Sequence, residues 1–129
     1  MDNEIVDDPL ASVWDAEEVW ADEFDAWCNE PGTWVPPNFG GLVRAVRATI
    51  LRRFSPFTSH EYFCLAAGPR FWIDESLVAP VFIGRTRDHG YHVWSGHLFD
   101  ASGFEVLVTD DAREAAGELE RLLDGWTPA

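Results

Sequence analysis

The chain has 129 residues, of which 47% are hydrophobic, and a formal net charge of −14 at pH 7. This length suffices for one domain with its own core, and seven Trp and nine Phe argue against intrinsic disorder. The charge argues against nucleic acid as a general partner, because phosphates repel so acidic a body, and it favours a basic protein instead.

The charged residues are unevenly distributed along the chain. Residues 1–31 hold eleven carboxylates and no cation, whereas residues 44–87 hold seven Arg and three acids. The chain has no Lys, so every basic residue is Arg. An acidic proteome would produce a similar composition, so the charge by itself leaves solubility and partner binding as alternatives.

Neither the thiols nor the N-terminus indicates export. Cys28 and Cys64 fit no metal or redox spacing, and we interpret them as a buried, reduced pair. Residues 1–10 lack the basic and apolar regions of a signal peptide, and no apolar run is long enough to cross a membrane. We therefore expect a cytoplasmic protein that does not enter a membrane.

A first helix is predicted over residues 9–29, after an acidic lead at residues 1–8 that we expect to be flexible. Its apolar residues recur at spacings of three and four and form one aromatic-rich face: Leu10, Val13, Trp14, Trp20, Phe24 and Trp27. Only Glu17 interrupts this face. Acidic residues occupy the other side: Asp15, Glu18, Asp22 and Asp25. Because like charges at these spacings destabilise a helix by roughly 0.2–0.5 kcal/mol per pair, we expect burial of all four aromatic side chains to stabilise it.

A second helix is predicted from residue 38 or 41 to residue 54, because Pro31-Gly32 and Pro36-Pro37 separate it from the first. Four Arg residues lie on its polar side: Arg44, Arg47, Arg52 and Arg53. If the two helices pack antiparallel, these Arg residues neutralise the acids of the first helix. Intramolecular pairing and partner binding therefore remain alternative interpretations of the acidic face.

Beyond Ser55-Pro56 the apolar pattern changes to that of β-strands. Strands are predicted at residues 60–66, 70–73, 79–86, 89–95 and 104–109. The short breaks between them indicate antiparallel pairing in a meander of four or five strands. Asp111 and Glu114 form a capping box for a C-terminal helix that ends before Gly125. The predicted fold is a single α+β domain over residues 9–129, with two N-terminal helices, the antiparallel sheet and the C-terminal helix packed on one face.

Histidine side chains are the main candidates for metal binding or catalysis in this chain. His89, His92 and His97 form the only cluster, but His92 and His97 would face opposite sides of one strand, which argues against a metal site. Ser59 and His60 alternate in the same way and are poorly placed as nucleophile and base. We therefore predict no catalytic residue, metal or cofactor. The three residues kept as the candidate lining of a pocket between sheet and helices are His60, His92 and His97.

Residues 51–60 (LRRFSPFTSH), a helix end that runs through PFTSH into a strand, resemble an actinobacterial family of unknown function. Its members are labelled natural product biosynthesis proteins. The resemblance extends over residues 40–125 and includes the last strand and the C-terminal helix. It implies a bacterial, cytoplasmic protein with an accessory role, and it carries over no catalytic residue.

The sequence predicts a small acidic interaction protein of the immunity, inhibitor or accessory type, and not an enzyme. It would bind a basic protein partner through acidic residues of the first helix, which steer association: Asp15, Glu18, Asp22 and Asp25. An exposed Trp, with Trp34 as the candidate, would anchor the complex. Two alternatives remain open: an accessory enzyme or small-molecule binder of bacterial specialised metabolism, and a DNA mimic whose carboxylates imitate phosphates.

Overall fold

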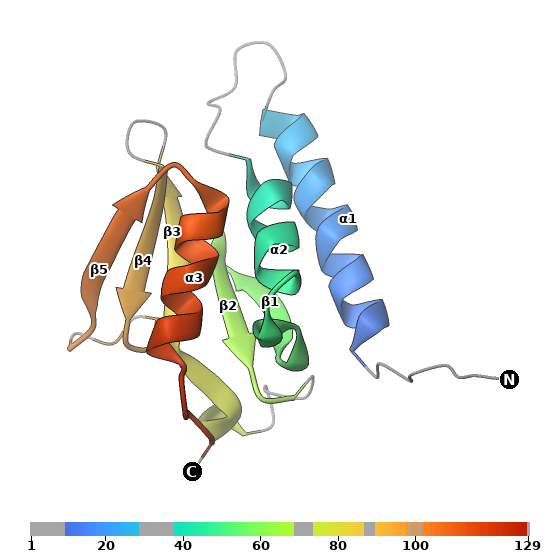
Figure 1. Cartoon of the computed structure of the whole chain (residues 1–129). Helices are drawn as coiled ribbons and strands as arrows, with labels where there is room; N and C mark the ends of the chain where they lie inside the picture. Colours follow the sequence, from blue (N-terminus) through green and yellow to red (C-terminus); the bar gives the residue numbers. More distant parts are fainter. Residues whose placement is uncertain are drawn as a thin grey trace, which may run out of the picture.

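The computed structural model describes residues 10–28, 38–68, 74–86, 90–98, 100 and 102–128. In chain order the elements are helices α1 (Ala11–Cys28) and α2 (Phe39–Arg47), the 3-10 helix η1 (Ile50–Arg53), strands β1 (Ser55–Ser59) and β2 (Tyr62–Ala66), the 3-10 helix η2 (Glu75–Leu77), strands β3 (Val78–Thr86), β4 (Gly90–Ser95) and β5 (Phe104–Thr109), and helix α3 (Ala112–Leu122). The strands form one antiparallel sheet in the order β1-β2-β3-β4-β5 (Figure 1). The predicted α+β fold with a meander sheet is confirmed.

The three helices lie side by side, with α2 in the middle (Figure 1). Helix α3 packs on β4 and β5, and α1 contacts α2 and the edge strand β1. The predicted packing of the C-terminal helix on one face of the sheet is therefore confirmed. Because α1 is the outermost helix, one of its sides faces away from the other described elements. None of the described helices is both long and apolar enough to cross a membrane.

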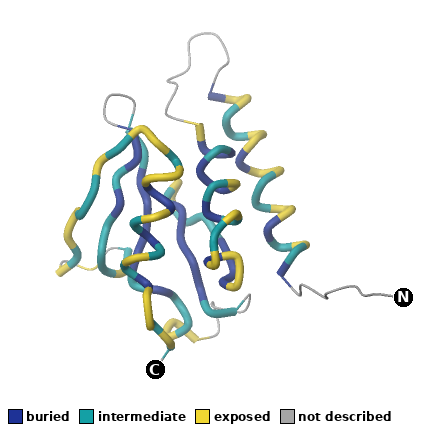
Figure 2. The backbone as a smooth tube through the Cα atoms, viewed as in Figure 1, coloured by how far each residue is buried: buried dark blue, intermediate teal, exposed yellow. Residues whose placement is uncertain are grey.

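The core fills the space between the helices and one face of the sheet (Figure 2). Strand alternation places Ala79, Val81 and Ile83 of β3 on this face, where all three are buried. Phe63 and Val93 pair with Ile83 from the two neighbouring strands and extend the same layer. The helices and η1 contribute further fully buried side chains: Trp14, Phe39, Leu42, Val46, Leu51 and Leu119.

The opposite face of the sheet, called the open face below, carries a second aromatic group. Phe82 lies between Val81 and Ile83 in β3 and therefore points to this face. The Trp94 ring stacks on the Phe82 ring at a centroid distance of 5.6 Å, and the Tyr62 ring meets it edge-on at 5.4 Å. Strand β3 thus contributes apolar side chains to both faces of the sheet.

The second helix is shorter than predicted. Helix α2 ends at Arg47, and the Thr49 hydroxyl donates to the Val46 carbonyl at 2.7 Å and accepts from the Leu51 N–H at 3.0 Å. A hydroxyl that bonds local backbone groups offers the chain an alternative to continued helix, and here it starts η1. The new path leaves Ile50 61% exposed.

A strand also precedes the first predicted one. Strand β1 pairs with β2 from Ser55↔Ala66 to Ser59↔Tyr62. The predicted strand start at His60 is wrong, because His60 and Glu61 have φ angles of 53° and 67° and form the turn between the two strands. Pro56 fits in β1 because β1 is an edge strand.

Helix α3 begins with a modified form of the predicted capping box. The Asp111 carboxylate accepts from the Arg113 N–H at 2.9 Å, as expected of an N-cap. The Glu114 carboxylate instead accepts from the Thr109 hydroxyl, whose oxygen accepts from the Asp111 N–H at 3.0 Å. Thr109 therefore connects the end of β5 to the first turn of α3. The buried side of the helix carries Ala115, Ala116 and Leu119, and Leu123 at the C-cap is buried as well.

Several predictions fall outside the described residues. They are the acidic lead at residues 1–8, the strand at residues 70–73, the anchor Trp34 and the cluster member His89. These stay predictions from the sequence.

Candidate functional site

The acidic face of α1 lies against α2. The Arg44 guanidinium makes two hydrogen bonds to the Asp22 carboxylate, at 2.9 and 2.6 Å, and its Nε lies 3.1 Å from Glu18 Oε1. One turn along α2, Arg47 Nη1 lies 2.8 Å from Asp15 Oδ1 and 2.5 Å from Glu18 Oε2. The Arg44 guanidinium lowers the pKa of Asp22. Two Arg residues thus bridge three of the four predicted partner-binding acids.

Asp25, the fourth of these acids, caps α2 from the neighbouring helix. Its two carboxylate oxygens accept from the backbone N–H groups of Phe39 and Gly40 at 2.8 and 2.7 Å. A carboxylate is favourable there, because the first N–H groups of a helix lack intrahelical partners and carry the positive end of its dipole. A side chain at position 40 would meet the Asp22 carboxylate and the Arg44 guanidinium, so these two groups would have to shift.

Intramolecular pairing was one of the two interpretations of the acidic face, and these contacts show such pairing. Asp25 near the end of α1 meets the start of α2, and Asp15 near the start of α1 meets the end of α2. The two helices are therefore antiparallel, and Arg44 and Arg47 neutralise part of the acidic face. A DNA mimic would need carboxylates that project outward without Arg partners, and this part of α1 does not favour it.

The interruption of the aromatic face by Glu17 also has a structural explanation. The Glu17 carboxylate accepts a hydrogen bond of 2.5 Å from the Thr58 hydroxyl of β1. Burial raises the pKa of Glu17, and the hydrogen bond from Thr58 opposes this rise in part. Glu17 is therefore a polar contact between helix and sheet.

The outer side of α1 exposes large apolar side chains. Trp27 is 60%, Val19 57% and Trp20 37% exposed. Glu23 lies between the two Trp residues on the same side of the helix, at i, i+3 and i+7 spacing, and is exposed. We call these four residues the α1 outer surface: Val19, Trp20, Glu23 and Trp27. The expected burial of Trp20 and Trp27 is wrong, because α1 is the outermost helix and only part of its wide aromatic face meets α2 and β1.

The aromatic rings of this surface are held by other rings. Trp20 stacks on Phe24 at a centroid distance of 5.3 Å and meets Phe39 edge-on at 5.2 Å. Trp27 lies 6.0 Å from Phe24. Beneath them the Arg85 guanidinium lies 4.8 Å from the Phe24 ring centroid and 4.0 Å from that of Phe39. The exposed Trp side chains are thus the outer members of an ordered aromatic cluster.

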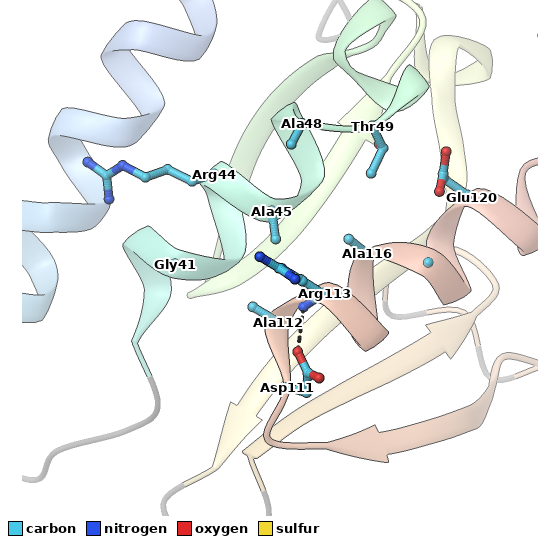
Figure 3. A pocket seen from close by; sticks show the side chains of 11 residues that line it. Gly41, Arg44, Ala45, Ala48, Thr49, Asp111, Ala112, Arg113, Ala116 and Glu120 are labelled. Carbon is cyan, nitrogen blue, oxygen red and sulfur yellow. Dashed lines mark hydrogen bonds between the residues drawn. The ribbon is translucent and has the colours of Figure 1, made fainter.

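A groove of about 790 Å³ runs between α2 and α3 (Figure 3). Its lining is mainly of small residues: Gly41, Ala45, Ala48, Ala112, Ala116 and Gly117. Figure 3 shows Arg44 pointing away from the groove toward α1, and Asp111 bonded to the α3 backbone. Arg44 and Asp111 are therefore engaged in contacts within the fold, and the other charged residues of the lining are Arg113 and Glu120 of α3.

The three candidate pocket histidines lie in three different places. His60 is exposed on the β1–β2 turn, where its Nδ1 lies 3.1 Å from Ser59 Oγ. His97 follows β4 and lines a depression of about 490 Å³ that also includes Cys64. His92 lines a separate cavity of about 160 Å³. The structure therefore does not bring these residues together into one pocket.

His92 makes two polar contacts with side chains of the neighbouring strands. It lies on β4 beside Val93, whose side chain is in the core, so His92 points to the open face. Its Nδ1 lies 2.5 Å from Glu105 Oε2 of β5, and its Nε2 lies 3.0 Å from Thr86 Oγ1 of β3. His92 was a candidate from its place in the sequence, whereas Thr86 and Glu105 were not, since neither has a local signal.

Both cysteines are buried and carry thiols, as predicted. Burial raises the pKa of the Cys64 thiol to about 12, so this thiol is protonated at neutral pH and is a poor nucleophile. Among the described residues, no group of three or more His, Cys, Asp or Glu side chains could hold a metal ion.

No match to this chain was found among protein-family models, curated proteins or solved structures. The resemblance of residues 51–60 to the actinobacterial family stays a prediction. In the structure this segment runs from η1 through β1 into the β1–β2 turn.

Proposed function

We propose that this protein is a protein-binding domain that engages a basic protein partner through the α1 outer surface. The observation that carries the proposal is the exposure of Trp20 and Trp27 on one side of a single helix. Contiguous apolar surface rimmed by charged residues is typical of an interaction site, and Trp is enriched among the residues that dominate binding energies.

The order of the aromatic cluster supports this role. Trp20 is held by stacking on Phe24 and by the edge contact with Phe39. A side chain that is already ordered loses less conformational entropy when a partner covers it. The α1 outer surface therefore presents Trp20 in a prepared conformation.

Charge supports the choice of a basic partner. Asp22 and Glu23 are exposed beside the anchor residues, and the whole chain carries a net charge of −14. Complementary charge mainly accelerates association and excludes wrong partners. In this proposal the acids that pair with Arg44 and Arg47 contribute to the long-range field, and the direct contacts come from the Trp residues and Glu23.

A peptide-display selection on the immobilised full chain tests the proposal. We expect the selected peptides to combine Arg or Lys with large apolar residues, and their association rate to fall as salt is raised. Trp27→Ser should weaken their binding about tenfold or more, a loss within the range of binding hot spots.

Phe104→Ser is the matched control. Phe104 on β5 is 60% exposed, the same fraction as Trp27, but lies outside the α1 outer surface. Selected peptides should bind this variant as they bind the unaltered chain. Peptides without basic residues, or equal losses in the two variants, would contradict the proposal.

A further inference from the structure

Three side chains on the open face of the sheet form a hydroxyl–imidazole–carboxylate chain. Thr86 Oγ1 lies 3.0 Å from His92 Nε2, and His92 Nδ1 lies 2.5 Å from Glu105 Oε2. The three residues come from three neighbouring strands, β3, β4 and β5. A nucleophile within hydrogen-bond reach of a base, with the base oriented by a third group, is the arrangement used for nucleophilic catalysis.

The chemistry of the three groups determines which atom donates and which accepts in each hydrogen bond. An ionised Glu105 carboxylate can only accept, so His92 Nδ1 must donate to it. In the neutral imidazole Nε2 is then the acceptor, and the Thr86 hydroxyl donates its proton toward Nε2. This is the tautomer that a general base needs in order to take a proton from Thr86.

A small cavity adjoins these groups. It has a volume of about 160 Å³, and Thr86 and His92 share its lining with Tyr62, Gly84, Arg85 and Trp94. Tyr62 packs so closely on Gly84 that a side chain at position 84 would collide with the Tyr62 ring. The cavity thus has two aromatic walls beside the hydroxyl and the imidazole, with room for a short acyl group.

We propose that Thr86, His92 and Glu105 form an acyl-transfer site for small, short-chain esters, which would be a second activity on the face opposite the helices. The Thr86 oxygen attacks the ester carbonyl carbon while its proton passes to His92 Nε2. The carbon–oxygen bond to the leaving alcohol breaks, and His92 returns the proton to that alcohol. Water then attacks the acyl-Thr86 ester with His92 as base, which releases the carboxylic acid and restores the Thr86 hydroxyl.

Glu105 acts through His92 and is a positioning residue. Its carboxylate keeps the proton on Nδ1 and stabilises the imidazolium that forms when Nε2 is protonated. The Glu105→Gln variant should therefore lower kcat by a larger factor than it raises KM. A contact that only holds the strands together would not produce this difference between the two effects.

Hydrolysis of p-nitrophenyl acetate by the full chain tests the proposal. Thr86→Val and His92→Ala should each lower the rate about 100-fold or more, and Thr86→Ser should keep turnover because it keeps the nucleophilic oxygen. After an acid quench, mass spectrometry should place one acetyl group on Thr86. The longer p-nitrophenyl decanoate should react more slowly because the cavity is small.

Thr109→Val is the matched control. Thr109 is also a strand threonine, and its hydroxyl donates to the Glu114 carboxylate as that of Thr86 donates to His92, so the variant loses a comparable hydrogen bond. It should retain the full rate. A Thr86→Val variant that keeps its activity would overturn the proposal, because His92 would then act without Thr86. So would an equal loss in Thr109→Val, an acetyl group on another residue, or no turnover by the unaltered chain.

Discussion

The inner and outer sides of α1 carry the same residue types in opposite surroundings. On the inner side Trp14 is fully buried, and its indole N–H donates to the carbonyls of Arg52 and Phe54 at 3.0 and 3.1 Å. On the outer side Trp27 is mostly exposed. Acids on the α2 side meet Arg residues or backbone N–H groups, as Asp25 does, whereas Glu23 is exposed. A residue type thus contributes to stability or to recognition according to what covers it.

The largest expected difference between the two sides is at the Trp residues. Trp14→Ala should lower the free energy of unfolding by about 3–5 kcal/mol, because it leaves a cavity in the core. Trp27→Ala should change it by no more than about 0.5 kcal/mol. Urea unfolding followed by circular dichroism measures both.

A milder variant covers the case in which Trp14→Ala does not fold. Trp14→Phe keeps an aromatic ring and removes the N–H that the Arg52 and Phe54 carbonyls accept. It should cost about 1–3 kcal/mol. Equal effects at positions 14 and 27 would contradict the comparison of the two sides.

The acids should differ in the same way, with a smaller range. Asp25→Ala should lower the free energy of unfolding by about 1–2 kcal/mol, because two N–H groups at the start of α2 lose their acceptor. Glu23→Ala should change it by less than about 0.5 kcal/mol. Thermal or urea unfolding of the two variants decides this, and a larger loss for Glu23→Ala would refute the assignment.

Each Arg should contribute less than the Asp25 cap. The Arg44→Gln, Arg47→Gln double variant should lose up to about 1 kcal/mol per Arg, because exposed ion pairs gain little over solvation. The loss should shrink at 1 M salt, where charges are screened over about 3 Å. Unfolding at low and high salt measures this. A loss that does not depend on salt would show that packing of the Arg side chains, and not charge, stabilises the contact.

Substitution of Glu17 should change the free energy of unfolding least, and at neutral pH it should raise this free energy instead of lowering it. Burial raises its pKa in the folded state above the ordinary value of 4.5. The folded state then binds the proton more tightly than the unfolded state, so stability falls as pH rises from 4.5 through the raised pKa. Glu17→Gln removes this penalty and keeps an acceptor for the Thr58 hydroxyl.

The variant should therefore be more stable than the unaltered chain at pH 7 and equally stable below pH 4.5. Unfolding curves across this pH range check the prediction. A Glu17→Gln variant that is less stable at pH 7 would show that the ionised carboxylate gains more from Thr58 than it loses by burial.

Elements with a strong local pattern were predictable. Residues 104–109 are rich in aromatic and β-branched residues and form β5 as expected, and the apolar spacing of α3 marks its buried side. The region between α2 and β2 was not predictable to the same degree. Whether Thr49 bonds the backbone and whether Pro56 fits in a strand depend on neighbours and on which strand lies at the sheet edge.

The candidate sites show the same limit. Pairing between the two N-terminal helices was an open alternative, because the spacing of charges on each helix is local information. The Thr86–His92–Glu105 arrangement depends on the register of three strands, and a shift of one residue would turn a side chain to the other face. The spacing of these residues in the chain does not reveal it.

The sequence by itself determined that α1 has an aromatic and an acidic side, that a meander of strands follows, and that a short helix closes the chain. The tertiary structure decided which aromatic residues stay exposed, which acids meet an Arg, and which hydroxyl reaches His92. The physical reason is the distance along the chain over which each kind of information acts. Periodicity records how one element divides between core and solvent, whereas helix order and strand register determine which neighbour covers each side chain.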